Sequence, residues 1–163
     1  MQPDDIARIP LRARDGSIRA YAVIDMADAE WASQWRWHLH PKGYATRSQK
    51  IDGIPRTFRL HRELPGLMGG DGLDVDHIDR DKLNCRRSNL RIVPKGKNSQ
   101  NQPSVRGSTS RYRGVSWRRD AGQWEAYVKT GGKQYRLGQF ASETEAAEAA
   151  RLGRARLLPF AVD

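Results

Sequence analysis

A short segment with the composition of a linker divides the chain. Residues 103–110 consist of Pro, Gly, Ser and Thr with one Val and one Arg, and such segments join folded units rather than contribute to a core. The whole chain has 163 residues, which is enough for one ordinary domain or for two small ones. The sequence therefore predicts two small units, one on each side of this linker.

Positive charge is concentrated in the middle of the chain. There are 29 Lys and Arg residues against 19 Asp and Glu, which gives a net charge of +10. Residues 82–119 hold 11 basic side chains and no acidic one. A short basic run is usually a solvated surface, but a run of this length favours a polyanionic partner, with nucleic acid ahead of anionic lipid.

The composition also argues against several classes of protein. No apolar run approaches the ~20 residues of a membrane-spanning helix, and the first residues lack the basic and apolar regions of a secretory signal. Cys85 is the only cysteine, so an intrachain disulfide and a multi-cysteine zinc site are excluded. A reducing compartment fits best, and we expect a cytoplasmic protein with no membrane partner.

Before the linker, the sequence predicts short strands and little helix. Residues 8–12 and 18–24 flank an Asp-Gly turn, residues 27–34 favour one or two helical turns, and residues 35–39 alternate as a half-buried strand does. A strand at 44–47 follows a Pro-Lys-Gly turn. Further strands are expected at 73–78 and 90–93, joined by a polar loop, and Pro94 is suited to the first turn of a helix over residues 95–102.

After the linker, the sequence predicts three strands and one helix. The strands are expected at 112–117, 123–129 and 133–137, with turns at Asp-Ala-Gly and Gly-Gly. Ser142 and Glu145 have the spacing of a capping box, and the helix after them is rich in Ala, which allows close packing on a sheet. Alternation directs Val115, Val128, Tyr135 and Leu137 toward this helix. The side chains that it directs to the opposite face of the sheet are Arg113, Arg118, Glu125, Tyr127, Lys129, Gln134 and Arg136.

Asp76, His77, Asn89 and Asn98 are the candidate catalytic residues. A carboxylate can hold a divalent cation while a neighbouring neutral imidazole takes a proton from water, and phosphodiester hydrolysis needs both. The amide oxygen of Asn98 is a hard ligand that suits Mg²⁺ or Mn²⁺, and Asn89 can bridge backbone groups across the polar loop. Each residue alone is commoner on a surface or in a loop. The order strand, loop, strand and basic helix makes the combination specific.

In this order the sequence resembles the HNH endonuclease family, in the branch of phage-type homing endonucleases where Asn replaces the last His. The residues that carry the resemblance are Val75-Asp76-His77-Ile78-Asp79, Asn84, Arg87-Ser88-Asn89-Leu90-Arg91-Ile92-Val93 and Asn98. The resemblance implies a ββα-metal nuclease over residues 58–102, preceded by a β-rich segment over residues 1–57. It also implies a bacterial or phage-infected cell as the place of action.

The same resemblance implies roles for individual residues. His77 would be the general base, Asp76 and Asn98 would hold one divalent ion, Mg²⁺ or Mn²⁺, and Asn89 would brace the loop. Asn101, one helical turn further, is the alternative to Asn98 as a ligand.

The roles of the remaining histidines and of the cysteine are less specific. Leu60-His61-Arg62 matches the leader of the family's motif, and His61 is either structural or close to the metal or phosphate. Cys85 is expected to be a free thiol without a catalytic role. His38 and His40 could join His61 and His77 in a zinc site, but the neighbouring Trp37 and Leu39 favour a simple strand.

The segment after the linker resembles the AP-two/ERF DNA-binding domain of plant ethylene-response factors. Tyr112-Arg113-Gly114-Val115, Trp124-Glu125-Ala126 and Leu137-Gly138-Gln139-Phe140 carry this resemblance. It implies, over residues 111–163, a three-stranded antiparallel sheet packed on one helix, with the exposed face of the sheet entering the major groove. Ser116-Trp117 and Ala149-Ala150-Arg151 depart from the family pattern, so the recognised DNA sequence stays open.

The sequence thus predicts an α+β protein that acts as a metal-dependent DNA endonuclease of the homing type. A monomer with one active site would nick double-stranded DNA. We expect Arg86, Arg87 and Arg91 to contact phosphate, with Arg91 in the catalytic group. The other expected DNA-binding residues are Lys95, Lys97, Arg111, Arg113, Arg118, Arg119, Tyr127, Lys129 and Arg136. The alternatives are a non-catalytic, sequence-specific DNA-binding protein on a decayed nuclease scaffold and an RNA-directed protein, which the lack of clustered exposed aromatic residues disfavours.

Overall fold

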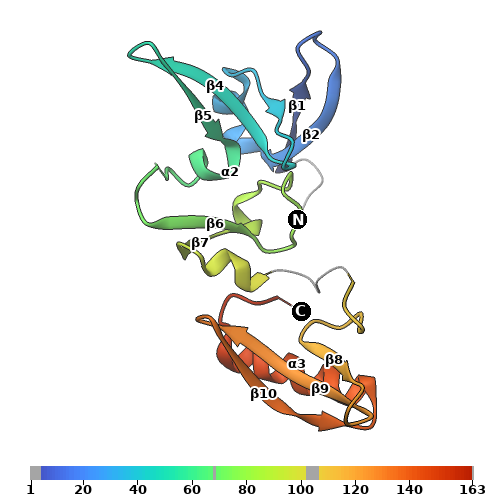
Figure 1. Ribbon diagram of the computed structural model, residues 1–163. Coiled ribbons are helices and arrows are strands. Elements are labelled where there is room, and N and C mark those ends of the chain that lie inside the picture. The colour runs from blue at the N-terminus through green and yellow to red at the C-terminus, as the bar shows by residue number, and fades with distance from the viewer. Residues whose placement is uncertain (1–4, 68, 102–106, 163) are drawn as a thin grey trace. The chain divides into compact units, whose positions relative to one another are not determined.

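The computed structural model describes residues 5–67, 69–101 and 107–162, with the side chains of residues 98 and 99 left aside (Figure 1). The chain forms two compact units, Met1–Gly96 and Lys97–Asp163, and each is described by itself. Both contain small antiparallel sheets and few helices, so the α+β class is confirmed. Within the described residues, no helix is long and apolar enough to cross a membrane.

The first unit is built from three small antiparallel sheets. Strand β1 pairs with β2, strands β3, β4 and β5 form a second sheet, and β6 pairs with β7. Four short helical segments, η2, α1, α2 and η3, lie between the strands. The strands are β1 Ile6–Arg12, β2 Ile18–Asp25, β3 His38–Leu39, β4 Ala45–Ile51, β5 Ile54–Arg59, β6 Leu73–His77 and β7 Leu90–Pro94. The helical segments are η2 Met26–Asp28, α1 Ala29–Ser33, α2 Leu60–Glu63 and η3 Arg87–Asn89.

The core of this unit joins segments that are far apart in the sequence. Leu11 on β1 and Ile24 on β2 pack with Trp37, Leu60 and Cys85. The indole N–H of Trp37 donates to the carbonyl oxygen of Ala32 at 2.8 Å, which satisfies the polar atom of a fully buried ring. Because Leu60 begins α2 and Cys85 lies between β6 and β7, the core fixes both segments against the β1–β2 hairpin.

The loop between β6 and β7 is also hydrogen-bonded to β2. The backbone N–H of Val23 donates to Leu83 and the N–H of Cys85 donates to Val23, each at 2.8 Å. Val23 and Asn84 thereby form a short parallel bridge. A polar loop that would otherwise lie free on the surface is therefore held at a defined position.

A buried ion pair positions α2. The guanidinium of Arg47, on β4, binds both carboxylate oxygens of Glu63 at 2.8 and 2.5 Å. The same guanidinium lies 3.8 Å from the centre of the Trp35 ring and 4.4 Å from that of Phe58. Bidentate geometry and flat aromatic neighbours suit Arg better than Lys, and the pair anchors the helix that carries His61.

Several elements before the linker differ from the prediction. The strand expected at 44–47 is β4 and runs to Ile51, and strand β5 was not expected. Of residues 35–39, only His38–Leu39 forms a strand. Residues 95–102 do not form the expected α-helix, because Pro94 ends β7 and the N–H groups of Lys95 and Gly96 bond back to Gly72 and Asp74. Gly96 then has φ +84°, and the chain continues as the 3-10 helix η4, Lys97–Asn101, in the second unit. The ββα arrangement is therefore not confirmed, and Gln102 lies outside the described residues.

The second unit has the predicted sheet and helix. Strands β8 Val115–Arg118, β9 Gln123–Thr130 and β10 Lys133–Phe140 form an antiparallel sheet in the order β10-β9-β8, followed by α3, Glu143–Leu157. The Oγ of Ser142 caps the helix by accepting from the N–H of Thr144 at 3.2 Å.

Small side chains allow the sheet and α3 to approach closely. Val115 and Ala126 pack on Ala146 and Ala150, and a Cβ at Gly114 would overlap the backbone of Tyr127. Tyr135 departs from its predicted burial: it pairs with the buried Val128, yet 43% of it is exposed. Arg113 also departs from its predicted outward direction, because it precedes β8 and donates to the carbonyl oxygen of Gln100 at 2.6 Å.

Candidate active site

Asp76 and His77 are buried at the end of β6. In the antiparallel pairing of β6 with β7, Asp76 lies opposite Arg91 and His77 lies opposite Leu90. Only 3% of Asp76 and 5% of His77 is exposed. Two adjacent residues point to opposite faces of a strand, so both faces of this strand end are covered by other parts of the unit.

The carboxylate of Asp76 is paired with the arginine opposite it. Its Oδ2 accepts from Nε and from an Nη of Arg91 at 2.9 and 2.6 Å. A buried carboxylate without such a partner would be costly. The strand register itself therefore places a positive charge against this buried carboxylate.

His77 lies within a cluster of three other side chains. Its Nε2 is 3.8 Å from the Sγ of Cys85, and its ring centre is 4.8 Å from that of His61 and 6.2 Å from that of Tyr44. Burial lowers the pKa of His77 below its usual 6.5, and the nearby carboxylates of Asp79 and Asp76 act in the opposite direction without reversing it. A neutral imidazole at pH 7 can accept a proton.

His61 is placed beside His77 by α2. Its burial, with smaller contributions from His77 and Arg59, lowers its pKa to about 3. Its Nδ1 has no hydrogen-bond partner among the described residues. The two imidazoles are thus both uncharged at neutral pH, and they meet edge to face.

Asn89 connects the two ends of the loop between β6 and β7. Its Oδ1 accepts from the N–H of Asp79 at 3.0 Å, and its Nδ2 donates to Asp79 Oδ1 at 2.8 Å and to the carbonyl oxygen of Asn84 at 2.7 Å. Its own carbonyl oxygen accepts from the N–H of Ile78. The side chain is buried at the centre of this network and sets the path of the chain after His77.

Cys85 is a free, buried thiol. Burial raises its pKa to about 12, so the thiol is protonated over the whole physiological range. It contacts the candidate base directly, which the sequence did not indicate.

The donor set fits a hard divalent cation at Asp76. A carboxylate offers two oxygens with about four acceptor positions, so an ion pair through Oδ2 is compatible with a cation at the same group. Asn98, the second expected ligand, lies in η4 of the second unit, and its side chain is outside the described residues. Across the described part of the chain, no group of three or more His, Cys, Asp or Glu side chains is arranged to hold a metal ion.

The three arginines expected to contact phosphate all have partners within the first unit. Arg87 binds both oxygens of Asp28 at 3.0 and 2.7 Å, Arg91 binds Asp76, and the Nε of Arg86 donates to Asn84. Lys95 is exposed. The sequence could not reveal the first of these pairs, because 59 residues separate its partners.

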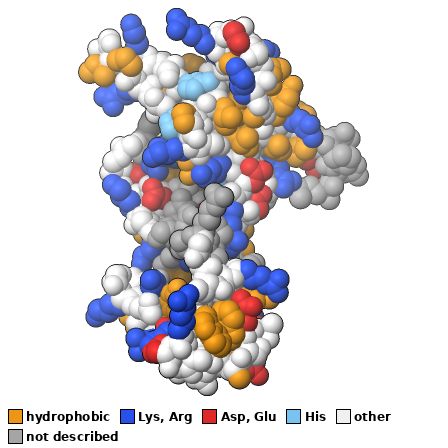
Figure 2. Space-filling model, turned by 45° about the vertical axis from the view of Figure 1, so that its right-hand side comes forward, with side chains coloured by type: hydrophobic (Ala, Val, Ile, Leu, Met, Phe, Trp, Pro, Cys, Tyr) orange, Lys and Arg blue, Asp and Glu red, His pale blue; other side chains and the backbone are white. Residues whose placement is uncertain are grey.

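The expected DNA-binding residues of the second unit lie mainly on the face of the sheet away from α3. On that face Glu125 is buried, and its Oε1 lies 3.2 Å from Nη1 of Arg118 and 3.4 Å from Nε of Arg136. Lys129 lies over the ring of Tyr127, and Arg111 lies over that of Tyr112. Arg119 and, in η4, Lys97 are exposed. Figure 2 shows Lys and Arg side chains spread over the visible surface of each unit.

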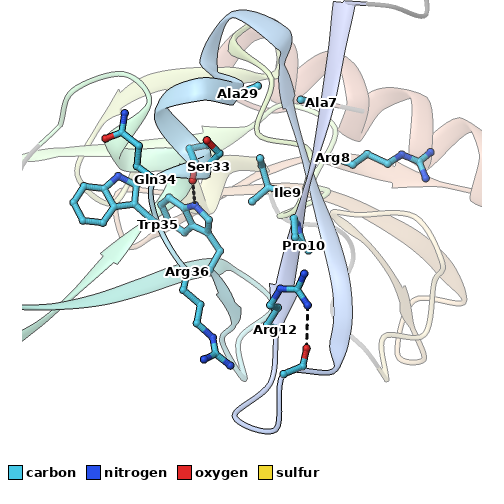
Figure 3. Close-up of a pocket in the computed structure, with 13 residues that line it drawn as sticks. Ala7, Arg8, Ile9, Pro10, Arg12, Ala29, Ser33, Gln34, Trp35 and Arg36 are labelled. Carbon is cyan, nitrogen blue, oxygen red and sulfur yellow. Dashed lines mark hydrogen bonds between the residues drawn. The ribbon is translucent and has the colours of Figure 1, made fainter.

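An open pocket of about 720 Å³ is formed beside β1 and α1 in the first unit (Figure 3). Residues 7–10 and 32–37 supply most of its lining. In Figure 3 the side chains of Arg8 and Arg36 point away from it, and Arg12 is bonded to Gly16. None of the candidate catalytic residues lines it.

Residues 67–100 match the HNH endonuclease family. The matched segment contains β6, the loop, β7 and most of η4, and thus includes Asp76, His77, Asn89 and Asn98. Over 64 residues, or 39% of this chain, the sequence is 36% identical to Protein 3.8 of Escherichia phage T7. That alignment covers 53% of the phage protein, so the chain spans about half the length of this curated relative. No solved structure matches.

The family match covers the segment in which the buried Asp76 and His77 lie. Nothing in the sequence singles out Arg59 or Lys82, and Tyr44 stands out only because Gly43-Tyr44-Ala45 resembles the leader of HNH nucleases. No spacing rule connects Tyr44 with a histidine 33 residues later.

Proposed function

We propose that this protein is a metal-dependent DNA endonuclease of the homing type that nicks double-stranded DNA at the β6–β7 site. The observation that carries the proposal is a buried, neutral His77 next to a buried Asp76, inside the segment that matches HNH endonucleases. A neutral base and a carboxylate at one strand end are the two protein groups that metal-assisted phosphodiester hydrolysis needs.

His77 takes the proton of the water molecule that attacks the scissile phosphorus. The imidazole is ready for this step because burial keeps it uncharged. Its contact with Cys85 and its edge-to-face contact with His61 limit rotation of the ring, and a fixed orientation favours in-line attack. Asn89 contributes indirectly by holding the loop that follows His77.

Asp76 and Asn98 would hold one Mg²⁺ or Mn²⁺ ion, which when bound supplies positive charge for the pentavalent transition state and the departing 3′ oxygen. Arg91 orients Asp76 through its two hydrogen bonds to Oδ2. The products would carry 5′ phosphate and 3′ hydroxyl ends. One site in a monomer would cut one strand per visit.

The second unit would act as an AP-two/ERF-like DNA-binding domain. Its three-stranded sheet exposes Arg118, Tyr127, Lys129 and Arg136 on the face opposite α3, and such a face can enter the major groove. The ion pairs with Glu125 hold Arg118 and Arg136 before DNA binds. With Lys97, Arg111, Arg113 and Arg119 of the same unit, this face would add a second weak contact to the one made by Arg86, Arg87 and Lys95 of the nuclease unit, and would so raise overall affinity.

One observation favours a second candidate, a DNA-binding protein without catalysis. The Oδ2 of Asp76 is already occupied by Arg91, and a scaffold that had lost its metal could retain such a pair. In this case the second unit would bind DNA sequence-specifically while the β6–β7 site stayed inert.

Cleavage of supercoiled plasmid separates the two candidates. We expect conversion to open circles in Mg²⁺ or Mn²⁺ and none in EDTA, with ends that DNA ligase can reseal. Linear product would instead indicate that both strands are cut. No cleavage of plasmid or of phage and bacterial genomic DNA, together with salt-sensitive gel shifts, would establish the binding protein. Stronger binding to RNA than to DNA at the same salt concentration would contradict both candidates.

A further inference from the structure

We propose that Tyr44, Arg59 and Lys82 form the DNA-backbone-binding part of the active site, in which Arg59 and Lys82 hold phosphate groups beside His77. The inference rests on the proposed function and assigns its substrate contact to residues other than the candidate catalytic ones, of which Tyr44 and Arg59 lie outside the segment that matches HNH endonucleases. It follows from three features: the position of Tyr44, the convergence of two cations on its ring, and the lack of carboxylates to neutralise them.

Tyr44 lies at the edge of the imidazole cluster. Its ring centre is 4.9 Å from that of His61 and 6.2 Å from that of His77. The residue immediately precedes β4, and its carbonyl oxygen accepts from the N–H of His40 at 2.9 Å. Tyr44 is only partly buried, so part of this residue is accessible to solvent next to the buried imidazoles.

Two exposed cations from different segments meet at this ring. The Nζ of Lys82, from the β6–β7 loop, is 4.9 Å from the ring centre, and the guanidinium carbon of Arg59, from the end of β5, is 5.6 Å away. The Nζ of Lys82 also donates to the carbonyl oxygen of Lys42 at 2.9 Å. Attraction to the ring face and this hydrogen bond hold both charges close to His77.

Neither cation is neutralised by an acidic side chain. Among the ion pairs of the described residues, Arg47, Arg62, Arg87 and Arg91 each have a carboxylate partner, whereas Arg59 and Lys82 have none. The nearby carboxylates of Asp79 and Asp81 form no ion pair with either cation among the described residues, and both accept hydrogen bonds from backbone N–H groups of their own loop. The backbone N–H of Asp81 donates to Oδ1 of Asp79, and the backbone N–H of Leu83 donates to Oδ1 of Asp81.

Two cations without a carboxylate partner beside a buried candidate base make a site for an anion that lies against that base. A DNA phosphate carries one negative charge, and the proposed reaction requires a phosphate near His77. Arg59 can bind such a group through two N–H donors, and Lys82 can bind it as a point charge. Tyr44 then acts as the support that keeps the two cations in place.

Charge removal tests the inference by two independent readouts. The variants are Arg59→Gln, Lys82→Gln and the double variant, compared with wild type and with the control Arg19→Gln. Arg19 is an exposed arginine near the start of β2, four residues and about 13 Å along the strand from Val23, which holds the loop. Circular dichroism and thermal unfolding verify that each variant is folded.

The first readout is binding to a fluorescent duplex as a function of salt. Each lost phosphate contact should lower the slope of log K against log salt by about 0.9, so the double variant should lose nearly 2 and Arg19→Gln nothing. The second readout is plasmid nicking, where each single variant should be slower by about 10-fold in kcat/KM, the effect of one charged hydrogen bond. Arg59→Lys should recover part of the rate because it restores the charge.

The outcomes distinguish this inference from the proposed function. A wild type that does not nick DNA would refute the proposed function, while the salt slopes would still decide whether Arg59 and Lys82 bind the backbone. A wild type that nicks DNA, with both glutamine variants matching Arg19→Gln in slope and rate, would overturn the inference alone.

Discussion

Replacing Asn89 by Ala should weaken the first unit more than any other single change in the loop between β6 and β7. The Asn89 side chain makes three hydrogen bonds, two with Asp79 and one with Asn84. At about 1 kcal/mol for each net hydrogen bond, the variant should lose about 3 kcal/mol of unfolding free energy. A domain of this size is stable by roughly 5–15 kcal/mol, so the loss is a large fraction of the total.

Urea unfolding measures this loss directly. Trp31, Trp35 and Trp37 lie in the first unit and Trp117 and Trp124 in the second. In a background in which Trp117 and Trp124 are replaced by Phe, tryptophan fluorescence follows the transition of the first unit. With a slope of about 2 kcal/mol per molar urea, the midpoint should fall by about 1.5 M. Ser88→Ala, in the same 3-10 helix but with an exposed side chain, should shift the midpoint by less than about 0.3 M. Equal midpoints for the two variants would refute the reasoning.

Three further predictions concern His61, Gly114 and Cys85. In the folded protein, burial lowers the pKa of His61 to about 3, whereas in the unfolded chain this side chain takes up a proton below about pH 6.5. The first unit should therefore lose stability as the pH falls below that value. His61→Gln should reduce that loss of unfolding free energy by up to about 1.4 kcal/mol per pH unit, as measured by urea unfolding at several pH values. If the unfolding free energies of variant and wild type fell in parallel with pH, this prediction would be contradicted. Gly114→Ala should cost about 2 kcal/mol or more in thermal unfolding because of its φ of +78° and the overlap with Tyr127, and Gly122→Ala, with open space around it, should cost less. Cys85, with a thiol pKa of about 12, should resist iodoacetamide at pH 8 until urea unfolds the chain; rapid labelling of the folded protein would contradict its burial.

The strands could be predicted where alternation and turn residues agree. Residues 8–12 and 18–24 form β1 and β2 around the Asp15–Gly16 turn, and the three strands after the linker appear with the helix that Ser142 caps. In each case the pattern is local, so a few neighbouring residues suffice to specify it. The expected helix after Pro94 failed because bonds from Lys95 and Gly96 to Gly72 and Asp74 extend the β6–β7 ladder. Those partners lie more than 20 residues away, beyond the reach of a local rule.

The residues of the candidate site are visible in the sequence, but their surroundings are not. The adjacent Asp76 and His77, with Asn89 at its spacing, are visible in the sequence. Contacts of His77 with Cys85, His61 and Tyr44 depend on how three separate segments pack. The pairs Arg87–Asp28 and Arg91–Asp76 likewise form only in the folded unit. A count of basic residues along the chain therefore cannot tell a cation that is neutralised within the protein from one that is available to DNA.

The central claim is that His77 is the base of a nuclease, and a comparison of His77→Ala with wild type tests it most directly. Both proteins are given supercoiled plasmid and Mg²⁺ at concentrations at which gel shifts show the same fraction of DNA bound. The account predicts equal binding and nicking that is slower by at least about 100-fold in the variant. Equal rates of nicking at equal binding would contradict it.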